Sequence, residues 1–306
     1  MKQYLARRLL LAVPSLLAVT ILIFLALRAV PGDPAVLLAG DFATPETVAS
    51  IRAQWGLDQP LPVQYGVFLR NLVRGDLGRS IVSDLEVREE IAQRFRVTLV
   101  LAVAAMAVAL TIGLSAGLLG AMRAYTLWDY GSMVVAMLGV STPIFWSGML
   151  LILLFAVVLG WLPSGGAEGW QAFILPAVSL GFFAAGIIAR QTRSAMLDVL
   201  RQDYVRTAHA KGVPNPRVAV VHALRNALIP VVTIVGLEFG RMLGGAILTE
   251  TVFSLPGLGS FLLTAIAKRD YPVVQGIVLW LAVVFVLINM LVDVAYAALD
   301  PRIRHA

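Results

Sequence analysis

The amino-acid sequence predicts an all-α polytopic membrane protein with six transmembrane helices and a polar insertion between the first two. Two observations come from composition: 59% of the 306 residues are hydrophobic and only 14% are charged, whereas soluble domains carry about 25% charged residues. The third observation is that the apolar residues gather in long runs. These runs approach or exceed the ~20 residues that a helix needs to cross the hydrocarbon core.

The charge and the cysteine content exclude several classes of protein. The formal net charge is +6, but the basic residues lie mainly beside the apolar runs, where they orient a chain in the membrane. No basic patch is interleaved with aromatic residues, so no nucleic-acid partner is expected. The absence of cysteine excludes disulfides, thiolate metal sites and a cysteine nucleophile.

The first predicted region, residues 1–30, holds a short basic start and a span over residues 9–27. A cleaved signal peptide is the alternative. The apolar run is longer than a typical signal core, however, and Ala26-Leu27-Arg28 is a poor cleavage site. We therefore expect an uncleaved span with a cytoplasmic N-terminus. Pro14 falls in its early turns, where a kink is tolerated inside a bundle.

The second region, residues 31–96, is polar and is predicted to be an extracytoplasmic insertion. Its first helix begins at Pro45 under a Thr44 cap and ends before Gly56. A second covers residues 64–73 and stops at Gly75, and a third over residues 87–95 leads into the second span. The mixed charges do not oppose this location, because long loops cross membranes largely regardless of charge. The insertion could be a solvated cap or a docking surface for a partner, and we favour docking.

The third region, residues 97–299, is the five-helix core, followed by the tail 300–306. Proline breaks the third span at Ser141-Thr142-Pro143 and the fourth at Pro176. Such breaks are either packing kinks or transporter hinges. The predicted spans are Val97–Met122, Met133–Leu159, Phe173–Ala189, Leu228–Leu248 and Val273–Leu299.

The distribution of Arg and Lys sets the predicted orientation. The connection 190–227 holds seven such residues, 123–132 holds Arg123, and 160–172 holds none. Basic residues in short loops favour the cytoplasm. Both termini, with Arg302 and Arg304 in the tail, and the connection 190–227 are therefore expected inside.

The polar connection contains a short predicted helix with its own start and stop. Asp203 is placed as its N-cap, Lys211 in its last turn and Gly212 as a left-handed residue after it, with Pro214 and Pro216 blocking continuation. An apolar stripe against a basic face is formed by Leu197, Leu200, Tyr204 and Ala208. Such a helix could lie on the bilayer surface or dock on another protein.

The same connection carries a family resemblance. Arg206-Thr207-Ala208, followed after three residues by Gly212, resembles the Glu-Ala-Ala…Gly loop of ABC-importer permeases, although Arg206 and Thr207 replace its Glu and first Ala. The strings DYVRTAHAKG and HALRNALIP are similar to the dipeptide/oligopeptide branch. The resemblance implies a type I ABC-importer permease fold, in which this loop is the coupling helix that contacts the ATPase. The implied coupling residues are Asp203, Tyr204, Arg206, Thr207, Ala208, Lys211 and Gly212.

Other segments resemble the same branch on the outer side. They are PGDP at 31–34, GDLGRS at 75–80, TETVFSLPGLGSF at 249–261 and RDYP at 269–272. Pro256-Gly257 favours a turn whose apolar flanks can tuck back among the spans. The stretch 249–261 could be a capping loop or part of an outer gate. The gate residues are then Glu250, Phe253, Pro256 and Gly257.

Charged residues within predicted spans mark a candidate translocation path. Glu238 and Arg241 lie three residues apart in the fifth span, and Asn289 and Asp293 share a face of the last. An Arg at a helix centre costs about +2.5 to +3.5 kcal/mol if it faces lipid. These groups are therefore expected either to pair and pack against other helices or to line the path.

The resemblance implies the permease subunit of an ATP-driven importer that carries peptides or similar small solutes across the bacterial cytoplasmic membrane. The chain has no G-x-x-x-x-G-K-[ST] motif, so it is expected not to be an enzyme and to bind no cofactor or metal. The implied partners are an external substrate-binding protein, a second related permease and two ATPase subunits that bind ATP and Mg.

Two alternatives are compatible with the sequence. An ion-coupled secondary transporter could use Glu238, Arg241 or Asp293 as ion sites, but no internal inverted repeat is found and the polar connection would have no purpose. A membrane receptor or scaffold would not need charged pairs in its spans. The accepted solute, and whether the two permeases are identical, stay open.

Overall fold

The computed structural model describes residues 2–29, 32–39, 43–214 and 217–299. Pro31, Pro216 and the tail with Arg302, Arg304 and His305 lie outside the described residues. The chain divides into two compact units, one of residues 97–256 and 285 onward, the other of residues 2–96 and 257–284. Each unit is described by itself below.

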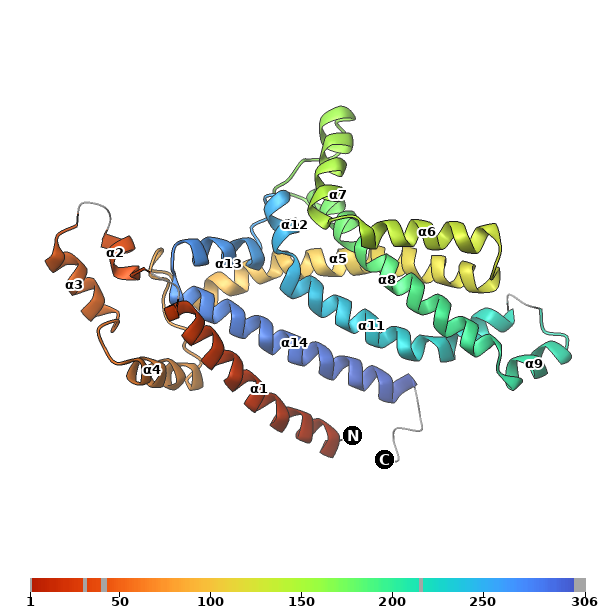
Figure 1. Cartoon of the computed structure of the whole chain (residues 1–306), viewed down its shortest axis with the longest axis horizontal. Helices are drawn as coiled ribbons and strands as arrows, with labels where there is room; N and C mark the ends of the chain where they lie inside the picture. The colour runs from red at the N-terminus through yellow and green to blue at the C-terminus, as the bar shows by residue number, and fades with distance from the viewer. Residues whose placement is uncertain (1, 30–31, 40–42, 215–216, 300–306) are drawn as a thin grey trace. The chain divides into compact units, whose positions relative to one another are not determined.

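The first unit is a bundle organised around α8 (Ile174–Leu200). Helix α8 packs against α6 (Leu127–Ser141), α7 (Ile144–Leu151) and α11 (Leu224–Gly245), and Figure 1 shows it running between α6 and α11. It is also the most buried of the apolar spans. The unit further contains part of α5 (Val87–Met122), the π-helix η1 (Ile152–Val158), the 3₁₀ turn η2 (Trp170–Phe173), α9 (Asp203–Ala210), the π-helix η3 (Val218–Ala223), α12 (Ile247–Val252) and the end of α14 (Tyr271–Leu299).

Small residues let the helices of this unit approach closely. A methyl group at Gly186 would meet the carbonyl of Ala136 in α6, and one at Gly117 would lie 2.6 Å from the carbonyl of Ala189. Helices in lipid associate through such close packing, since no hydrophobic effect drives them together there. The contacts of α8 with α5 and α6 therefore require glycine at these positions.

The second unit contains the insertion and the first span. It is built from α1 (Lys2–Ala29), α2 (Pro34–Ala39), α3 (Pro45–Gln54), α4 (Leu61–Val73), the start of α5, α13 (Leu258–Ala267) and the start of α14. Helix α4 is fixed to α1, because the Tyr65 hydroxyl lies 3.0 Å from Thr20 Oγ1 and the ring of Phe24 packs on Tyr65 and Phe68.

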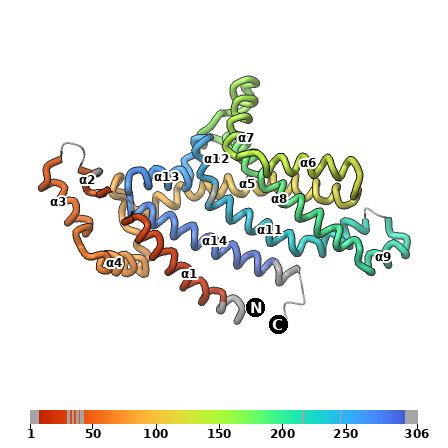
Figure 2. The backbone as a smooth tube through the Cα atoms, in the orientation of Figure 1, coloured from red at the N-terminus to blue at the C-terminus, as the bar shows by residue number. Residues whose placement is uncertain are grey.

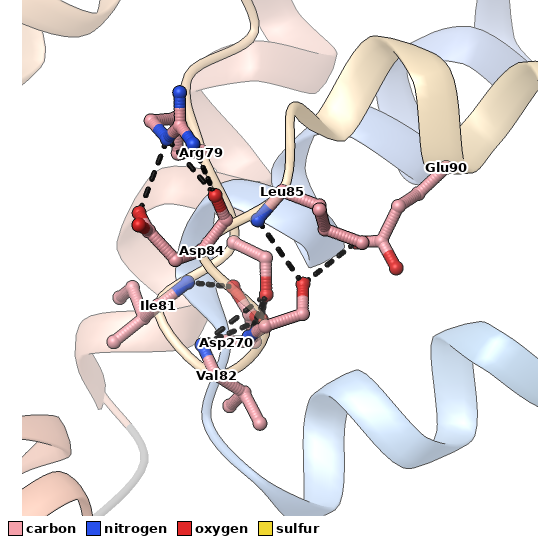
Figure 3. A network of polar contacts seen from close by, with 9 residues as sticks. Arg79, Ile81, Val82, Asp84, Leu85, Glu90 and Asp270 are labelled. Carbon is pink, nitrogen blue, oxygen red and sulfur yellow. Dashed lines mark hydrogen bonds and ion pairs between the residues drawn. The ribbon is translucent and has the colours of Figure 1, made fainter.

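A polar network fixes the end of the insertion within this unit (Figure 3). The buried Asp270 carboxylate accepts hydrogen bonds from the Ser80 hydroxyl at 2.5 Å, from Ile81 N at 3.2 Å and from Val82 N at 3.4 Å. The Ser83 hydroxyl donates to Glu90 Oε2 at 3.2 Å. One carboxylate thus joins GDLGRS to RDYP, two segments about 190 residues apart that the sequence presented separately.

Most predicted elements are confirmed, with differences at their ends. Among the described residues, five helices are long and apolar enough to cross a membrane, and six if the bent pair α6 and α7–η1 counts as one span. Thr44 caps α3 as predicted, its Oγ1 accepting from Thr47 N at 3.3 Å. Helix α4 begins at Leu61, three residues before the prediction, and residues 87–95 are the first turns of α5 and not a separate helix. Helix α2 was not predicted.

One prediction about breaks in the spans is confirmed, and two others about the spans are wrong in detail. As predicted, Ser141-Thr142-Pro143 breaks the third span, which bends by 102° between Ser141 and Ile144 and appears in Figure 2 as an abrupt turn of the tube. Pro176 lies in the first turn of α8 and does not break it, because a proline there removes no helical hydrogen bond. The fourth and fifth helices extend into the predicted polar connection, to Leu200 and from Val218 respectively, so only residues 201–217 connect them.

We expect Asp270→Asn to destabilise the second unit. Both carboxylate oxygens accept hydrogen bonds, so an amide NH₂ group must face a backbone or hydroxyl donor, at a cost of about 1–3 kcal/mol. Thermal stability and limited proteolysis of residues 75–86 in detergent measure this loss. Asp84→Asn is the control, because Asp84 is exposed and its ion pair is with the exposed Arg79, which contributes little stability. Equal proteolysis rates in the two variants would contradict this role of Asp270.

Candidate functional site

The first candidate site is the short helix α9, Asp203–Ala210. The prediction of Asp203 as N-cap is wrong: Gln202 takes that position, without a side-chain hydrogen bond, and Asp203 is the first helical residue. Asp203 still places a negative charge in the first turn, where the helix dipole favours it. Its carboxylate lies 3.7 Å from Arg206, but both side chains are largely exposed, so this ion pair contributes little stability.

The C-terminal end of α9 is fixed by its backbone. Gly212 has φ of +77°, as predicted, its N–H donates to His209 O at 2.9 Å, and Val213 N donates to Ala208 O at 3.2 Å. These two bonds form a Schellman motif around a left-handed glycine, with Lys211 as the C-cap residue. The stop of this helix therefore depends on residue 212 having no side chain.

Two side chains attach α9 to the spans. Val205 is almost fully buried, and the Tyr204 hydroxyl accepts a hydrogen bond of 2.7 Å from Asn226 Nδ2 of α11. The predicted apolar stripe is wrong, since Leu197 and Leu200 belong to α8 and Tyr204 is 42% exposed. Thr207 donates to Asp203 O at 3.0 Å within the helix. The buried Val205 and the bond to Tyr204 thus attach α9 to the bundle, while its other face stays polar and exposed.

A buried ion pair that sequence reasoning missed lies between α6 and α8. Arg193 donates through Nε to Asp129 Oδ1 at 2.6 Å and through Nη2 to Oδ2 at 2.7 Å, and Tyr125 N donates to Oδ2 at 2.9 Å. Asp129 is 1% exposed. A bidentate pair of this kind fixes both distance and orientation. It ties the start of α6 to the last turns of α8, just before α9 begins.

The predicted intramembrane charges take up two different environments. Glu238 is buried, whereas the side chain of Arg241 is 67% exposed, and their contact of 2.8 Å confirms the pairing within the helix. Asn289 donates to the Phe285 carbonyl at 3.0 Å, and Asp293 is half-buried one turn further on. One face of α11 therefore presents a guanidinium that the described residues of the chain do not cover.

The predicted outer-gate residues lie at or near the α12 turn, and two of them have buried side chains. Glu250 is fully buried and accepts a hydrogen bond of 2.6 Å from Thr98 Oγ1. Phe253 is 1% exposed, its ring lies against Gly148, and its carbonyl accepts from Gly166 N at 2.9 Å. Pro256 and Gly257 follow in the turn before α13. The apolar flanks tuck inward as expected.

Within the described parts of the chain, no group of three or more His, Asp or Glu side chains could hold a metal ion. The polar side chains described above form ion pairs or hydrogen bonds within one helix or between two helices. The long apolar helices of the described residues are those of a multi-pass membrane protein.

Comparison with known proteins gives the family. Residues 109–305 match the family described as binding-protein-dependent transport system inner membrane component, and residues 1–102 match its N-terminal family. The chain is 48% identical over 305 residues to the proteins named glutathione transport system permease protein GsiC of Escherichia coli (strain K12) and Salmonella typhi, covering 100% of this chain and of each relative.

Solved structures of low sequence identity share the fold. The MetNI methionine ABC transporter in an inward-facing conformation matches 69% of this chain and 96% of its own, with a TM-score of 0.59 and 20% identity. A chain of an amino acid ABC transporter matches with a TM-score of 0.54 and 16% identity, over 69% of this chain and 94% of its own.

The chain therefore belongs to the binding-protein-dependent transport system inner membrane component family and is a permease subunit of an ABC importer in the inner membrane. This assignment rules out the secondary transporter and the scaffold as interpretations of the sequence. The solved ABC transporters share the multi-pass α-helical fold of this chain.

We expect Asp129→Ala to lower the free energy of unfolding by about 2–3 kcal/mol. Removing one partner of a fully buried ion pair costs ~3–5 kcal/mol. The expected loss is smaller here because the Arg193 side chain is 25% exposed. A double-mutant cycle with Arg193→Ala in detergent measures the coupling. The exposed pair Asp203–Arg206 is the matched control and should couple weakly. Additive losses at Asp129 and Arg193 would contradict a fixed ion pair.

Proposed function

We propose that this permease subunit carries short peptides or related small solutes, and that α9 transmits the ATPase cycle to the spans. The cargo proposal is supported by 48% identity, over the whole chain, to permeases named for glutathione transport, since glutathione is itself a tripeptide. The coupling proposal is supported by one observation: α9 exposes one face while Val205 and Tyr204 hold the other on the bundle.

The assembly that we propose contains two ATPase subunits, a second related permease and an extracytoplasmic binding protein. ATP and Mg are bound by the ATPase subunits, because the sequence has no phosphate-binding loop of its own. Both termini and residues 201–217 face the cytoplasm and the insertion faces outward, as the distribution of Arg and Lys favours. The exposed residues of α9 and its cap then form the ATPase contact; they are Asp203, Arg206, Thr207 and Lys211.

We place the translocation path along α11 and the end of α14. The exposed Arg241 guanidinium would cost about 2.5–3.5 kcal/mol against lipid, so an aqueous path or the second permease must cover it. Asn289 and Asp293 are assigned to the same path. The outer gate is the α12 turn with Glu250, Phe253, Pro256 and Gly257, where the buried Glu250 carboxylate bonds to Thr98 and the Phe253 side chain is buried.

We expect Gly212→Val to uncouple the importer without removing the protein from the membrane. A β-branched residue at φ +77° costs about 1–2 kcal/mol or more, and no neighbouring atom blocks the side chain, so the strain is confined to the cap of α9. In proteoliposomes with the ATPase and the binding protein, uptake of a labelled dipeptide and of glutathione should fall several-fold. Recovery of the ATPase with the permease should fall as well.

Gly75→Val is the matched control, because Gly75 has the same φ of +77° and equally open surroundings, but lies in the insertion. It should leave ATPase recovery unchanged. Wild-type uptake and ATPase recovery in Gly212→Val would show that α9 is not the coupling element. Absence of uptake of both solutes by the wild-type importer, with ATP hydrolysis intact, would contradict the cargo proposal alone.

A further inference from the structure

The second unit contains a cavity of about 440 Å³ that none of the proposed roles uses. It is lined by the ends of α1 and α3, by α4, by the connection after α4 and by the start of α14, and it is open to solvent. Its size falls within the range of small-molecule sites. We propose that this cavity binds a small carboxylate-bearing solute with neighbouring amide groups, such as a short peptide, and that Arg28 is its anchoring cation.

Arg28 is held in a fixed orientation at the cavity wall. Its Nε and Nη2 donate to Gln64 Oε1 at 3.0 and 2.7 Å, Nη1 donates to Phe24 O at 3.3 Å, and Cζ lies 3.5 Å from the centre of the Phe24 ring. Gln64 is fixed in turn, because its Nε2 donates to the carbonyl of Gln59 at 2.8 Å. The guanidinium is therefore positioned before any ligand arrives, which lowers the cost of binding.

This half-buried cation has no carboxylate partner among the residues that the structure describes. Arg79, the other cation of the lining, already pairs with Asp84 at 3.1 Å. The one acid in the lining, Asp76, accepts a hydrogen bond from Gly78 N at 2.8 Å. The lining residues are two cations and one acid, and Arg28 is the cation without a carboxylate partner. A half-buried guanidinium gains most from a ligand that brings a negative charge.

A second group in the lining also lacks a partner. Gln275 is only 6% exposed, and its Nε2 has no hydrogen bond in the described part of the protein. Buried donors of this kind are nearly always paired in proteins. Further side-chain amides from Gln54, Gln59 and Asn71 line the cavity, as do the rings of Trp55 and Phe68. Amide groups beside apolar rings suit a peptide better than an inorganic anion.

This inference rests on the proposed function in two respects: that the insertion faces outward, and that peptides are the solutes that reach it. On that basis, the insertion offers the solute a site on the permease itself, separate from the path along α11. Binding can be measured without transport, so the two proposals are tested independently.

The test measures binding of labelled dialanine to the purified full-length permease in lipid nanodiscs, without the binding protein. The comparison ligand is dialanine amide, which lacks only the carboxylate, and inorganic phosphate is the third probe. Wild-type permease should bind dialanine about 10-fold or more tightly than the amide, because a charge-assisted contact to Arg28 is lost. Arg28→Gln should weaken dialanine binding to a similar extent and remove the preference for the carboxylate.

Two variants serve as controls for folding and for charge. Gln275→Leu removes an unpaired buried amide, so it should keep the thermal stability and still weaken dialanine binding several-fold. Arg70→Gln removes an exposed charge of α4 that does not line the cavity, and it should bind as the wild type does.

Equal affinity for dialanine and its amide, or unchanged binding in Arg28→Gln, would overturn the inference. So would binding of phosphate alone, which would assign the cavity to a phosphate group such as a lipid headgroup. Failure of dialanine binding with normal peptide uptake would overturn only this inference. Binding without any peptide uptake would support it and count against the proposed cargo.

Discussion

The structure depends on one constraint: in the hydrocarbon core there is no water to satisfy a polar group or to drive apolar surfaces together. Helices therefore carry the backbone through, and small residues hold them. At α8 this means glycine and alanine against the backbone of α5 and α6, with Gly181 and Gly186 at the contacts. Any charge placed in these helices needs a partner, and the buried Glu238 has one in Arg241 of the same helix.

The same constraint explains how the short helix α9 can act on the spans in the coupling role that we propose. Helix α8 leads to α9 through a connection of only two residues, and the bidentate Asp129–Arg193 pair fixes the end of α8 to α6. On the other side, the hydrogen bond from Asn226 to Tyr204 ties α9 to α11. A displacement of α9 is thus resisted by two helices at once, which is what a mechanical link between subunits requires.

The sequence predicted the features that depend on neighbouring residues. Apolar runs located the spans, Thr44 located a helix start, and Gly212 located a helix stop, because each signal lies within a few positions of its effect. The N-cap was predicted at Asp203, one residue after its actual position at Gln202. An Asp suits both the cap and the first turn of a helix, so the sequence did not distinguish the two positions. The polar extension of α8 to Leu200 was missed, because hydropathy alone does not show that a helix continues beyond the membrane.

Contacts between distant residues could not be predicted. Asp129 and Arg193 are 64 positions apart, and Ser80 and Asp270 are 190 apart, with no local pattern that marks either pair. The family resemblance identified GDLGRS and RDYP as separate segments, and only the structure brings them to one carboxylate. The lack of a carboxylate partner for Arg28 likewise depends on its neighbours in space. In the sequence, Arg28 is simply a basic residue at the end of an apolar run, which is common in membrane proteins.

In the coupling role that we propose, the exposed face of α9 meets the ATPase, and site-specific cross-linking can detect this contact. Because the chain has no cysteine, Arg206→Cys introduces a single reactive thiol on that face. Arg123→Cys, exposed in the α5–α6 connection, is the matched control on the same predicted side of the membrane. We expect a short cross-linker to join Arg206→Cys to the ATPase subunit and to leave Arg123→Cys unlinked. Cross-linking at Arg123→Cys alone, or at neither position in an assembled importer, would contradict the proposed contact.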